Sequence, residues 1–159
     1  MIRDFNADTD MRDLRNCMMQ LQDFERSVDG RIPSGQDIVD DYIPGMLFKC
    51  RAFDGKILVS ETDGVVSGYV MVLARMRSDE LQDGDYEYGL VSDLVVDHRY
   101  RGQGLGRELL EAAESWVRSK NIGVLRIGVY AENRVARDLY AASGFSEFYV
   151  EFEKNLSNP

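Results

Sequence analysis

The residues best suited to chemistry in this chain form a glycine-rich turn, Arg101-Gly102-Gln103-Gly104-Leu105-Gly106. Three glycines within five residues would start a helix poorly unless a ligand must approach the backbone. Glycine has no Cβ and accepts unusual φ values, so successive N–H groups can converge on one point. The first N–H groups of a helix also lack internal partners and lie at the positive end of the helix dipole. The turn therefore predicts an anion site suited to a phosphate or pyrophosphate.

The sequence on either side of the turn supplies the elements that would hold it. The run Leu94-Val95-Val96 is typical of a buried strand, and apolar residues at helical spacing continue from Leu105 to Trp116. A P-loop is excluded, because Gly106 is followed by Arg107 rather than by Lys and Ser or Thr. A dinucleotide fingerprint is excluded too, because its third glycine would stand at position 107.

A second group of candidate residues follows the next predicted strand. Asn133 stands where it would cap a helix, Tyr140 comes seven residues later, and Gly144 would close the helix at its C′ position. Taken alone, these residues need be no more than a helix cap, a core aromatic side chain and a helix end. Their position about thirty residues after the glycine-rich turn gives them a further meaning.

Both segments resemble the GNAT superfamily of N-acetyltransferases. The pattern Arg-x-x-Gly-x-Gly at Arg101, Gly104 and Gly106 is similar to the pyrophosphate-binding motif of that superfamily. The segment from Asn133 to Phe145 resembles the part in which an asparagine binds the pantetheine arm and a tyrosine is the general acid. The resemblance covers the whole chain in layout, and its specific motifs lie between Asp93 and Phe145.

The resemblance implies a fold, a reaction and a set of site residues. It implies an α/β fold of the α+β type, the GNAT acyltransferase fold, with a mixed, mostly antiparallel sheet of six or seven strands and about four flanking helices. One domain, residues 1–159, would move the acetyl group of acetyl-CoA directly to a primary amine without a metal. The implied acetyl-CoA ligands are Leu94, Val95, Val96, Arg101, Gly102, Gln103, Gly104, Leu105, Gly106, Arg107, Asn133 and Tyr140.

The resemblance also implies catalytic roles. Tyr140 would donate a proton to the departing thiolate. Asp93 would be the general base, because it is the only carboxylate within Val91–Val96 and many GNAT proteins carry a base on this strand. A structural hydrogen bond at the opening of the strand is the alternative role for Asp93. His98 lies in the turn and is expected to be a solvated loop residue.

The acceptor pocket is implied in residues 20–45 and 78–88. Carboxylates and aromatic rings there suit a cationic amine, although residues 78–87 are equally compatible with a solvated hairpin. The acceptor is expected to be a small molecule; a protein N-terminus or lysine, or a non-catalytic module that binds or senses acyl-CoA, are the other functions left open. The candidate side chains are Phe24, Glu25, Asp29, Tyr42, Asp79, Glu80, Asp85, Tyr86 and Tyr88.

Composition limits the partners. A net charge of −9 argues against a nucleic-acid surface and is compatible with a cationic acceptor. No apolar run reaches the length of a membrane span and no signal peptide is recognisable, so a cytoplasmic protein is expected. Cys17 and Cys50 with one histidine make neither a zinc set nor a disulfide framework, and both are expected to be core residues.

The remaining patterns predict secondary structure. A strand is expected at residues 1–5, a helix from Thr9 to residue 28, and a helix from Asp37 that Pro44 kinks or restarts. Thr62-Asp63-Gly64 predicts a hairpin. The last strand is expected at Phe145–Glu153, where it would be a candidate surface for a homodimer. The other expected elements are strands at 57–61, 65–76, 88–96 and 124–130, and helices at 104–120 and 133–143.

Overall fold

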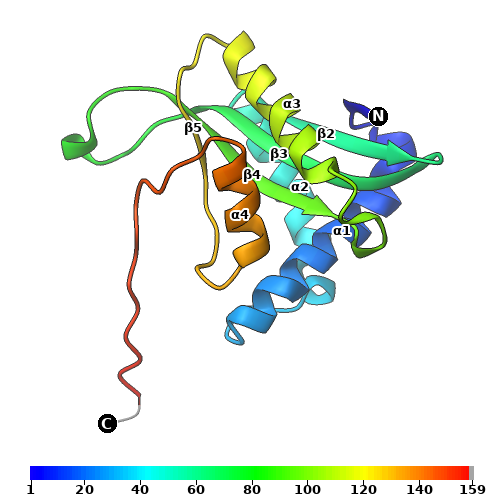
Figure 1. Cartoon of the computed structure of the whole chain (residues 1–159), viewed down its shortest axis with the longest axis horizontal. Coiled ribbons are helices and arrows are strands. Elements are labelled where there is room, and N and C mark those ends of the chain that lie inside the picture. The colour runs from blue at the N-terminus through cyan, green and yellow to red at the C-terminus, as the bar shows by residue number, and fades with distance from the viewer. Residues whose placement is uncertain (158–159) are drawn as a thin grey trace.

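The computed structural model describes residues 1–157 and has a central sheet with helices on both faces (Figure 1). The strand order is β1-β2-β3-β4-β5, antiparallel except for the parallel pair β4–β5. The mixed sheet and the four helices that the sequence predicted are confirmed, but the sheet has five strands within residues 1–157 instead of six or seven. The elements are β1 (Ile2–Asp4), α1 (Ala7–Val28), α2 (Gly35–Ala52), β2 (Gly55–Thr62), β3 (Val65–Met76), η1 (Leu81–Asp83), β4 (Tyr88–Val96), η2 (His98–Tyr100), α3 (Leu105–Ser119), β5 (Leu125–Ile127) and α4 (Arg134–Ala142).

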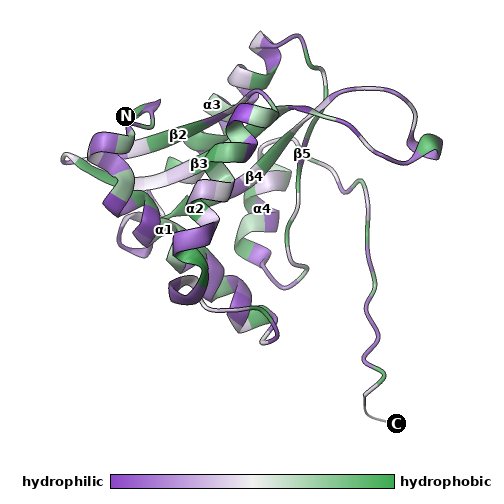
Figure 2. Ribbon diagram, turned by 180° about the vertical axis from the view of Figure 1, so that it is seen from behind, coloured by the Kyte–Doolittle hydropathy of each residue, from purple (hydrophilic) through white to green (hydrophobic). Residues whose placement is uncertain are grey.

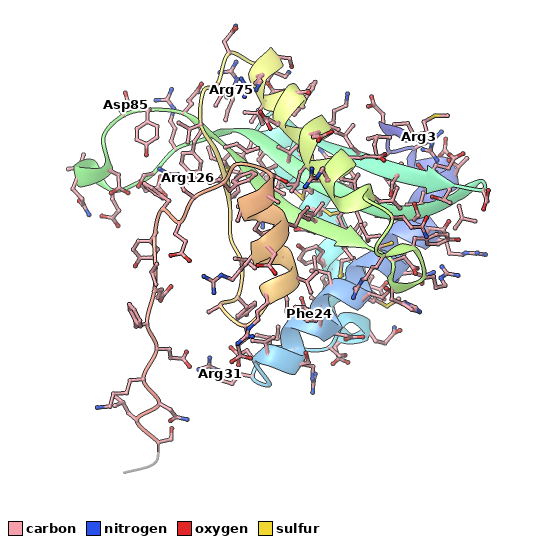
Figure 3. The ribbon with its side chains drawn as sticks, in the orientation of Figure 1. Arg3, Phe24, Arg31, Arg75, Asp85 and Arg126 are labelled. Carbon is pink, nitrogen blue, oxygen red and sulfur yellow. The ribbon has the colours of Figure 1, made fainter. Side chains whose placement is uncertain are left out.

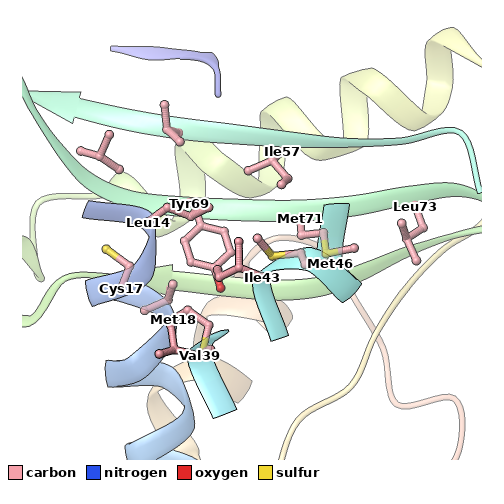
Figure 4. Close-up of a cluster of buried hydrophobic side chains, with 13 residues drawn as sticks. Leu14, Cys17, Met18, Val39, Ile43, Met46, Ile57, Tyr69, Met71 and Leu73 are labelled. Atoms are coloured by element: carbon pink, nitrogen blue, oxygen red, sulfur yellow. The ribbon is translucent and has the colours of Figure 1, made fainter. Parts of the chain in front are cut away.

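Two apolar clusters hold the helices against the two faces of the sheet. On one face, α1 and α2 pack through residues such as Met18 and Ile43 against Tyr69 and other residues of β2, β3 and β4 (Figure 4). On the other face, α3 packs through Leu109 and Val117, and α4 adds partly buried side chains at the edge of this cluster. The colouring of Figure 2 shows the same separation, because apolar residues gather on the strands and on the inner sides of the helices.

The two cysteines belong to the first cluster, as the sequence predicted. Burial raises the pKa of the Cys17 thiol to about 12 and that of the Cys50 thiol to about 11. Both are therefore protonated near neutral pH, and a protonated thiol is a poor nucleophile. Their surroundings fit small core residues and not reactive groups.

A bulge in β4 sets the direction of the side chains that follow it. Asp93 lies opposite Met71 of β3, whereas Val91 lies opposite the next residue, Val72, so Ser92 has no partner in the register. Successive side chains of a strand point to opposite faces, and one extra residue reverses the phase beyond it. The bulge therefore turns Asp93 toward α1 and α2 instead of toward α3.

The helix starts differ in detail from those that the sequence predicted. Helix α1 begins at Ala7 with Asn6 as its N-cap, because the Asn6 side chain accepts from the Asp8 N–H at 3.0 Å. Asp10 in the first turn is buried and accepts from both terminal nitrogens of Arg3, at 2.6 and 3.0 Å.

Helix α2 runs without interruption through Pro44, so the expected restart there is absent. Its first turn is closed by a capping box, in which Ser34 and Asp37 each accept a backbone N–H of the other. Pro44 is exposed and lies in the middle of the helix. The buried positions Val39, Ile43 and Met46 recur at helical spacing on both sides of Pro44, so packing against the sheet outweighs the lost hydrogen bond.

The predicted strand at Phe145–Glu153 is absent, and this prediction was wrong. The segment carries no regular secondary structure and runs away from the body of the protein (Figure 1, red). Phe148 and Phe152 are 75% and 92% exposed, although the alternation had suggested one buried face. A strand is stable only when a neighbour satisfies its backbone, and no strand pairs with residues 145–157. The homodimer surface expected there stays a prediction.

Two glycines of α2 give a stability test with an internal control. A Cβ at Gly35 would lie 2.6 Å from the Cα of Met19 in α1, whereas a Cβ at Gly45 would meet no atom within 4 Å. We expect Gly35→Ala to destabilise the protein by about 1–3 kcal/mol through backbone displacement. Gly45→Ala should stabilise it by up to about 1 kcal/mol. Urea unfolding measures both values, and equal effects would contradict the contact between α1 and α2.

Candidate active site

The glycine-rich turn forms an anion cradle at the start of α3. Gly102 and Gly104 have φ values of +76° and +85°, and Gly104 is the N-cap of α3 without a side-chain hydrogen bond. A Cβ at either glycine would meet open space, so both are required by backbone conformation and not by crowding. Among the described residues, no acceptor binds the backbone N–H groups of residues 103–106. These donors and the helix dipole make a cradle for a phosphate group.

The part of β4 that leads into this turn has an open edge. β4 pairs with β5 only at Gly89, Leu90 and Val91. From Asp93 to Val96, β4 is paired with β3 on one side and with no described strand on the other. Backbone groups on the open edge are available to an extended ligand that reaches the anion cradle.

Helix α4 packs against the cluster that contains α3 and carries Tyr140. Asn133 is its N-cap and accepts from the Ala136 N–H at 3.1 Å, as the sequence predicted. Leu139 lies close to the cradle, because a Cβ at Gly106 would be 3.2 Å from its Cδ2 atom. Gly144 adopts the positive φ expected at the end of the helix.

The Tyr140 side chain is partly buried against the α3 cluster, with its ring centroid 6.0 Å from that of Phe145. Burial raises the pKa of the Tyr140 hydroxyl to about 12, and the charge of Glu25 adds to the shift. Within residues 1–157 the hydroxyl has no hydrogen-bond partner. Tyr140 is therefore a protonated phenol at neutral pH that is free to donate.

Asp93 is surrounded by hydroxyl donors. Tyr42 of α2 donates to its two carboxylate oxygens at 2.9 and 3.0 Å, and Tyr69 of β3 donates to Oδ2 at 2.8 Å. Ser92 donates to Oδ1 at 3.1 Å. Asp93 is only 3% exposed, and three hydroxyl groups share its two carboxylate oxygens. Of the two roles that the sequence left open, these contacts favour the structural one.

Glu25 is the second carboxylate at this site. A cavity of about 130 Å³ is lined by Glu25 of α1, Tyr42 of α2 and Asp93 of β4, together with the apolar side chains Met18 and Leu21. Burial raises the pKa of Glu25 above its ordinary value, and the negative charge of Asp93 raises it further. No hydrogen bond or ion pair to the Glu25 carboxylate occurs in the part of the chain that the structure describes.

The structure brings together only part of the predicted acceptor region. Glu25 and Tyr42 meet at the cavity, but the loop at residues 78–87 lies elsewhere. Figure 3 shows Asp85 of this loop and Phe24 of α1 at separate ends of the molecule. The carboxylates Asp85 and Glu87 of the loop are paired with Arg77. His98 is exposed on η2, as predicted.

Two residues of this site were missed by sequence reasoning. Tyr69 anchors Asp93 from within an otherwise apolar strand, and Ser92 forms the bulge that aims Asp93. A signal existed for the first, because a carboxylate within a buried strand requires donors, and a tyrosine on a neighbouring apolar run can supply one. The bulge had no signal, since its register depends on pairing between strands.

No group of three or more His, Cys, Asp or Glu residues within residues 1–157 is arranged to hold a metal ion. None of the helices that the structure describes is both long and apolar enough to cross a membrane.

Comparison with known proteins gives a family match and several relatives. The family model for acetyltransferases (GNAT) matches residues 16–145. An uncharacterized N-acetyltransferase, YycN of Bacillus subtilis, is 31% identical over 91 residues, which are 57% of this chain and 54% of YycN. A streptothricin acetyltransferase of Escherichia coli is 34% identical over 87 residues, 55% of this chain and 50% of that enzyme. The matched part thus spans about half the length of these curated relatives.

Solved structures share the fold at low sequence identity. A mutant of the BH1408 protein from Bacillus halodurans has a TM-score of 0.79 at 19% identity, covering 98% of this chain and 99% of that one. The aminoglycoside N-acetyltransferase AAC(6')-Iy in complex with CoA has a TM-score of 0.67 at 20% identity and covers 98% of both chains. At these identities the likeness shows the fold alone.

Proposed function

The chain belongs to the acetyltransferase (GNAT) family, and from this premise we propose that it moves the acetyl group of acetyl-CoA to the primary amine of a small molecule. One observation carries the proposal: the free N–H groups at the start of α3 follow directly on the open edge of β4. Acetyl-CoA needs such a pair of sites, because its pyrophosphate requires clustered donors and its pantetheine arm requires an extended run of backbone.

The proposed acetyl-CoA site uses the predicted residues. Backbone N–H groups of residues 102–106 would bind the pyrophosphate, whereas the N–H of Arg107 donates to the Gly104 carbonyl at 3.0 Å. Leu94, Val95 and Val96 would contact the pantetheine arm through the main chain. Arg101 donates from Nε to the Val96 carbonyl at 3.1 Å, which stabilises the junction between β4 and the turn. Asn133 would contact the arm from the start of α4.

The proposed chemistry assigns the acid role to Tyr140. Attack of an amine on the thioester carbonyl moves negative charge onto the oxygen and then onto the sulfur. Backbone N–H groups of the β4 edge would stabilise the charge on oxygen. The Tyr140 hydroxyl would donate its proton to the sulfur as the C–S bond breaks, which avoids the release of a free thiolate.

The surroundings of the cavity support a small amine as acceptor. The cavity beside Asp93 measures about 130 Å³, well below the size of a pocket that encloses a whole drug-sized ligand. It suits the amino end of an acceptor whose remainder lies outside. The matched streptothricin acetyltransferase and the structurally similar aminoglycoside N-acetyltransferase are named for small-molecule substrates, and we propose the same class here.

The proposal is tested by release of CoA from acetyl-CoA in the presence of amine panels. Aminoglycosides, polyamines, amino acids, arylamines and short peptides would be compared, with controls that omit protein or amine. Turnover of one small-amine class is the expected result. Turnover of peptides alone would indicate that the acceptor is a protein N-terminus or a lysine side chain. Binding of acetyl-CoA without turnover of any amine would favour a sensing module.

Substitution of Gly104 by tryptophan tests the anion cradle. The new side chain would occupy the space above the free N–H groups and would also be strained by the φ of +85°. We expect the affinity for CoA, measured by calorimetry, to fall at least about tenfold, which corresponds to about 1.4 kcal/mol. Gly123→Trp is the matched control, because Gly123 also faces open space but lies beyond α3. Equal affinities of the two variants for CoA would show that the anion cradle does not bind CoA.

A further inference from the structure

The carboxylate best placed to take a proton from the acceptor lies on α1 and not on β4. We propose that Glu25 is the general base of this site and that Asp93 is a positioning residue that fixes the cavity wall through Tyr42. The inference rests on the proposed acetyl transfer and adds a catalytic residue to it. Three observations carry it: the three hydroxyl groups that donate to Asp93, the free carboxylate of Glu25, and the cavity that both residues line.

The Asp93 carboxylate is poorly suited to remove a proton, because it already accepts hydrogen bonds on both oxygens. A general base must offer a lone pair to the proton that it removes. Tyr42, Tyr69 and Ser92 already donate to both oxygens of Asp93, at 2.8–3.1 Å. Proton uptake by Asp93 would weaken these buried hydrogen bonds, because a neutral carboxyl group is a poorer acceptor than a carboxylate. Asp93 therefore stabilises the wall of the cavity better than it removes protons.

The Glu25 carboxylate, in contrast, accepts no hydrogen bond from a described side chain. It is partly buried, it lines the same cavity, and no described side chain donates to it. The charged or titratable groups that act on it or sense its charge are Asp93 from β4, Tyr42 from α2 and Tyr140 from α4. None of these groups is a cation, so nothing in this set competes with an incoming ammonium group for the carboxylate. Two carboxylates around one cavity favour a cationic head group.

Glu25 also influences Tyr140, the proposed general acid. The charge of Glu25 contributes to the raised pKa of Tyr140, so the two side chains are electrostatically coupled. Glu25 extends from α1 and Tyr140 from α4, and these helices cover opposite faces of the sheet. Beyond Val91 no described strand pairs with the outer edge of β4, so this open edge leaves room for an acceptor between the base and the acid.

The proposed reaction balances as follows. The Glu25 carboxylate takes one proton from the ammonium group of the acceptor, and the free amine forms a C–N bond to the thioester carbonyl. Collapse of the tetrahedral species breaks the C–S bond, and Tyr140 gives its proton to the sulfur. A second proton from the attacking nitrogen returns to the Tyr140 oxygen. Glu25 then releases its proton to solvent, so that one amide, one CoA thiol and one proton are formed.

The activity test compares Glu25→Gln with Glu111→Gln, using an amine that the panel identifies. Both changes remove one negative charge, but Glu111 is exposed on α3 and its carboxylate has no partner in the described chain. We expect Glu25→Gln to lower kcat/KM about 10²- to 10³-fold near neutral pH and to abolish the acid limb of the pH profile. Its rate should recover as the pH approaches the pKa of the acceptor amine. Glu111→Gln should have the same kcat/KM and the same pH profile as the wild type.

The second test does not depend on turnover. Carbon-13 NMR of carboxyl-labelled protein would follow the titration of Glu25, assigned by the loss of its signal in Glu25→Gln. The midpoint should lie above the ordinary value of about 4.3. Asp93→Asn should move it downward, because a neighbouring negative charge is removed. A midpoint near 4.3 that is the same in the wild type and in Asp93→Asn would overturn the proposal.

The failures of the two proposals are distinguishable. Full activity and an intact acid limb in Glu25→Gln would reject Glu25 as the base while leaving acetyl transfer in place. A wild-type protein that binds acetyl-CoA but turns over no amine would reject the proposed function, and the base role of Glu25 would fall with it. Thermal unfolding of each variant is the control that distinguishes a loss of activity from a loss of fold.

Discussion

Replacement of Tyr140 by phenylalanine is expected to lower kcat by about 10²- to 10⁴-fold while it leaves the affinity for acetyl-CoA almost unchanged. The hydroxyl is the only group that the change removes, and it makes no hydrogen bond within the described chain. The ring would keep its packing against Phe145. Loss of the proton donor leaves the departing sulfur as a thiolate, whereas binding of the pyrophosphate depends on the backbone of the glycine-rich turn.

The measurement is steady-state turnover combined with calorimetry of acetyl-CoA. Tyr149→Phe is the matched control, because it removes the same hydroxyl from an exposed side chain of the C-terminal segment. With a pKa raised to about 12, Tyr140 keeps its proton from pH 6 to pH 9, so no basic limb from this residue is expected in that range. Wild-type turnover in Tyr140→Phe would remove Tyr140 from the acid role.

Short-range features of this protein could be predicted well from its sequence. The positive φ values of Gly102 and Gly104, the cap at Asn133 and the end of α4 at Gly144 each depend on neighbours within a few residues. The hairpin at Thr62-Asp63-Gly64 also formed as expected, with positive φ at Asp63 and Gly64. Such features follow from local conformational preferences, which are readable without knowledge of the fold.

Features that depend on pairing between distant segments could not be read in the same way. The bulge at Ser92 changes which face receives Asp93, and it exists only relative to β3. A strict alternation would have turned Asp93 toward α3, away from Tyr42 and Tyr69. The role of Asp93 was therefore left open by the sequence, and the contacts of the folded chain were needed to favour one alternative.

The C-terminal segment illustrates a different limit. The alternation of Phe148, Val150 and Phe152 indicates a strand, but a strand also needs a neighbouring backbone. Here the segment is held by side chains instead: Phe148 stacks on the Arg126 guanidinium at 4.3 Å, and Glu153 pairs with Arg31 at 2.8 Å. Periodicity shows which side chains could share a face, and it does not show what would cover that face.

Substitution of Asp93 by asparagine is expected to lower the free energy of unfolding by about 2–4 kcal/mol. The amide keeps the shape of the carboxyl group but replaces one strong acceptor by a donor. The hydroxyls of Tyr42 and Tyr69 would lose charge-assisted hydrogen bonds in a buried place, where water does not replace them. Asp79→Asn removes the same charge from an exposed loop and should change stability by less than about 0.5 kcal/mol.

The same variant separates the two roles of Asp93 by its pH profile. If Asp93 positions the cavity wall, urea unfolding will show the loss of stability, and the acid limb will remain but shift to lower pH. The shift follows from the sign of the charge, because removal of a negative neighbour makes Glu25 easier to deprotonate. If Asp93 were the base, the acid limb would disappear and activity would return only where the amine is already neutral. An acid limb that persists in Asp93→Asn and vanishes in Glu25→Gln would therefore assign proton removal to α1 and support of the site to β4.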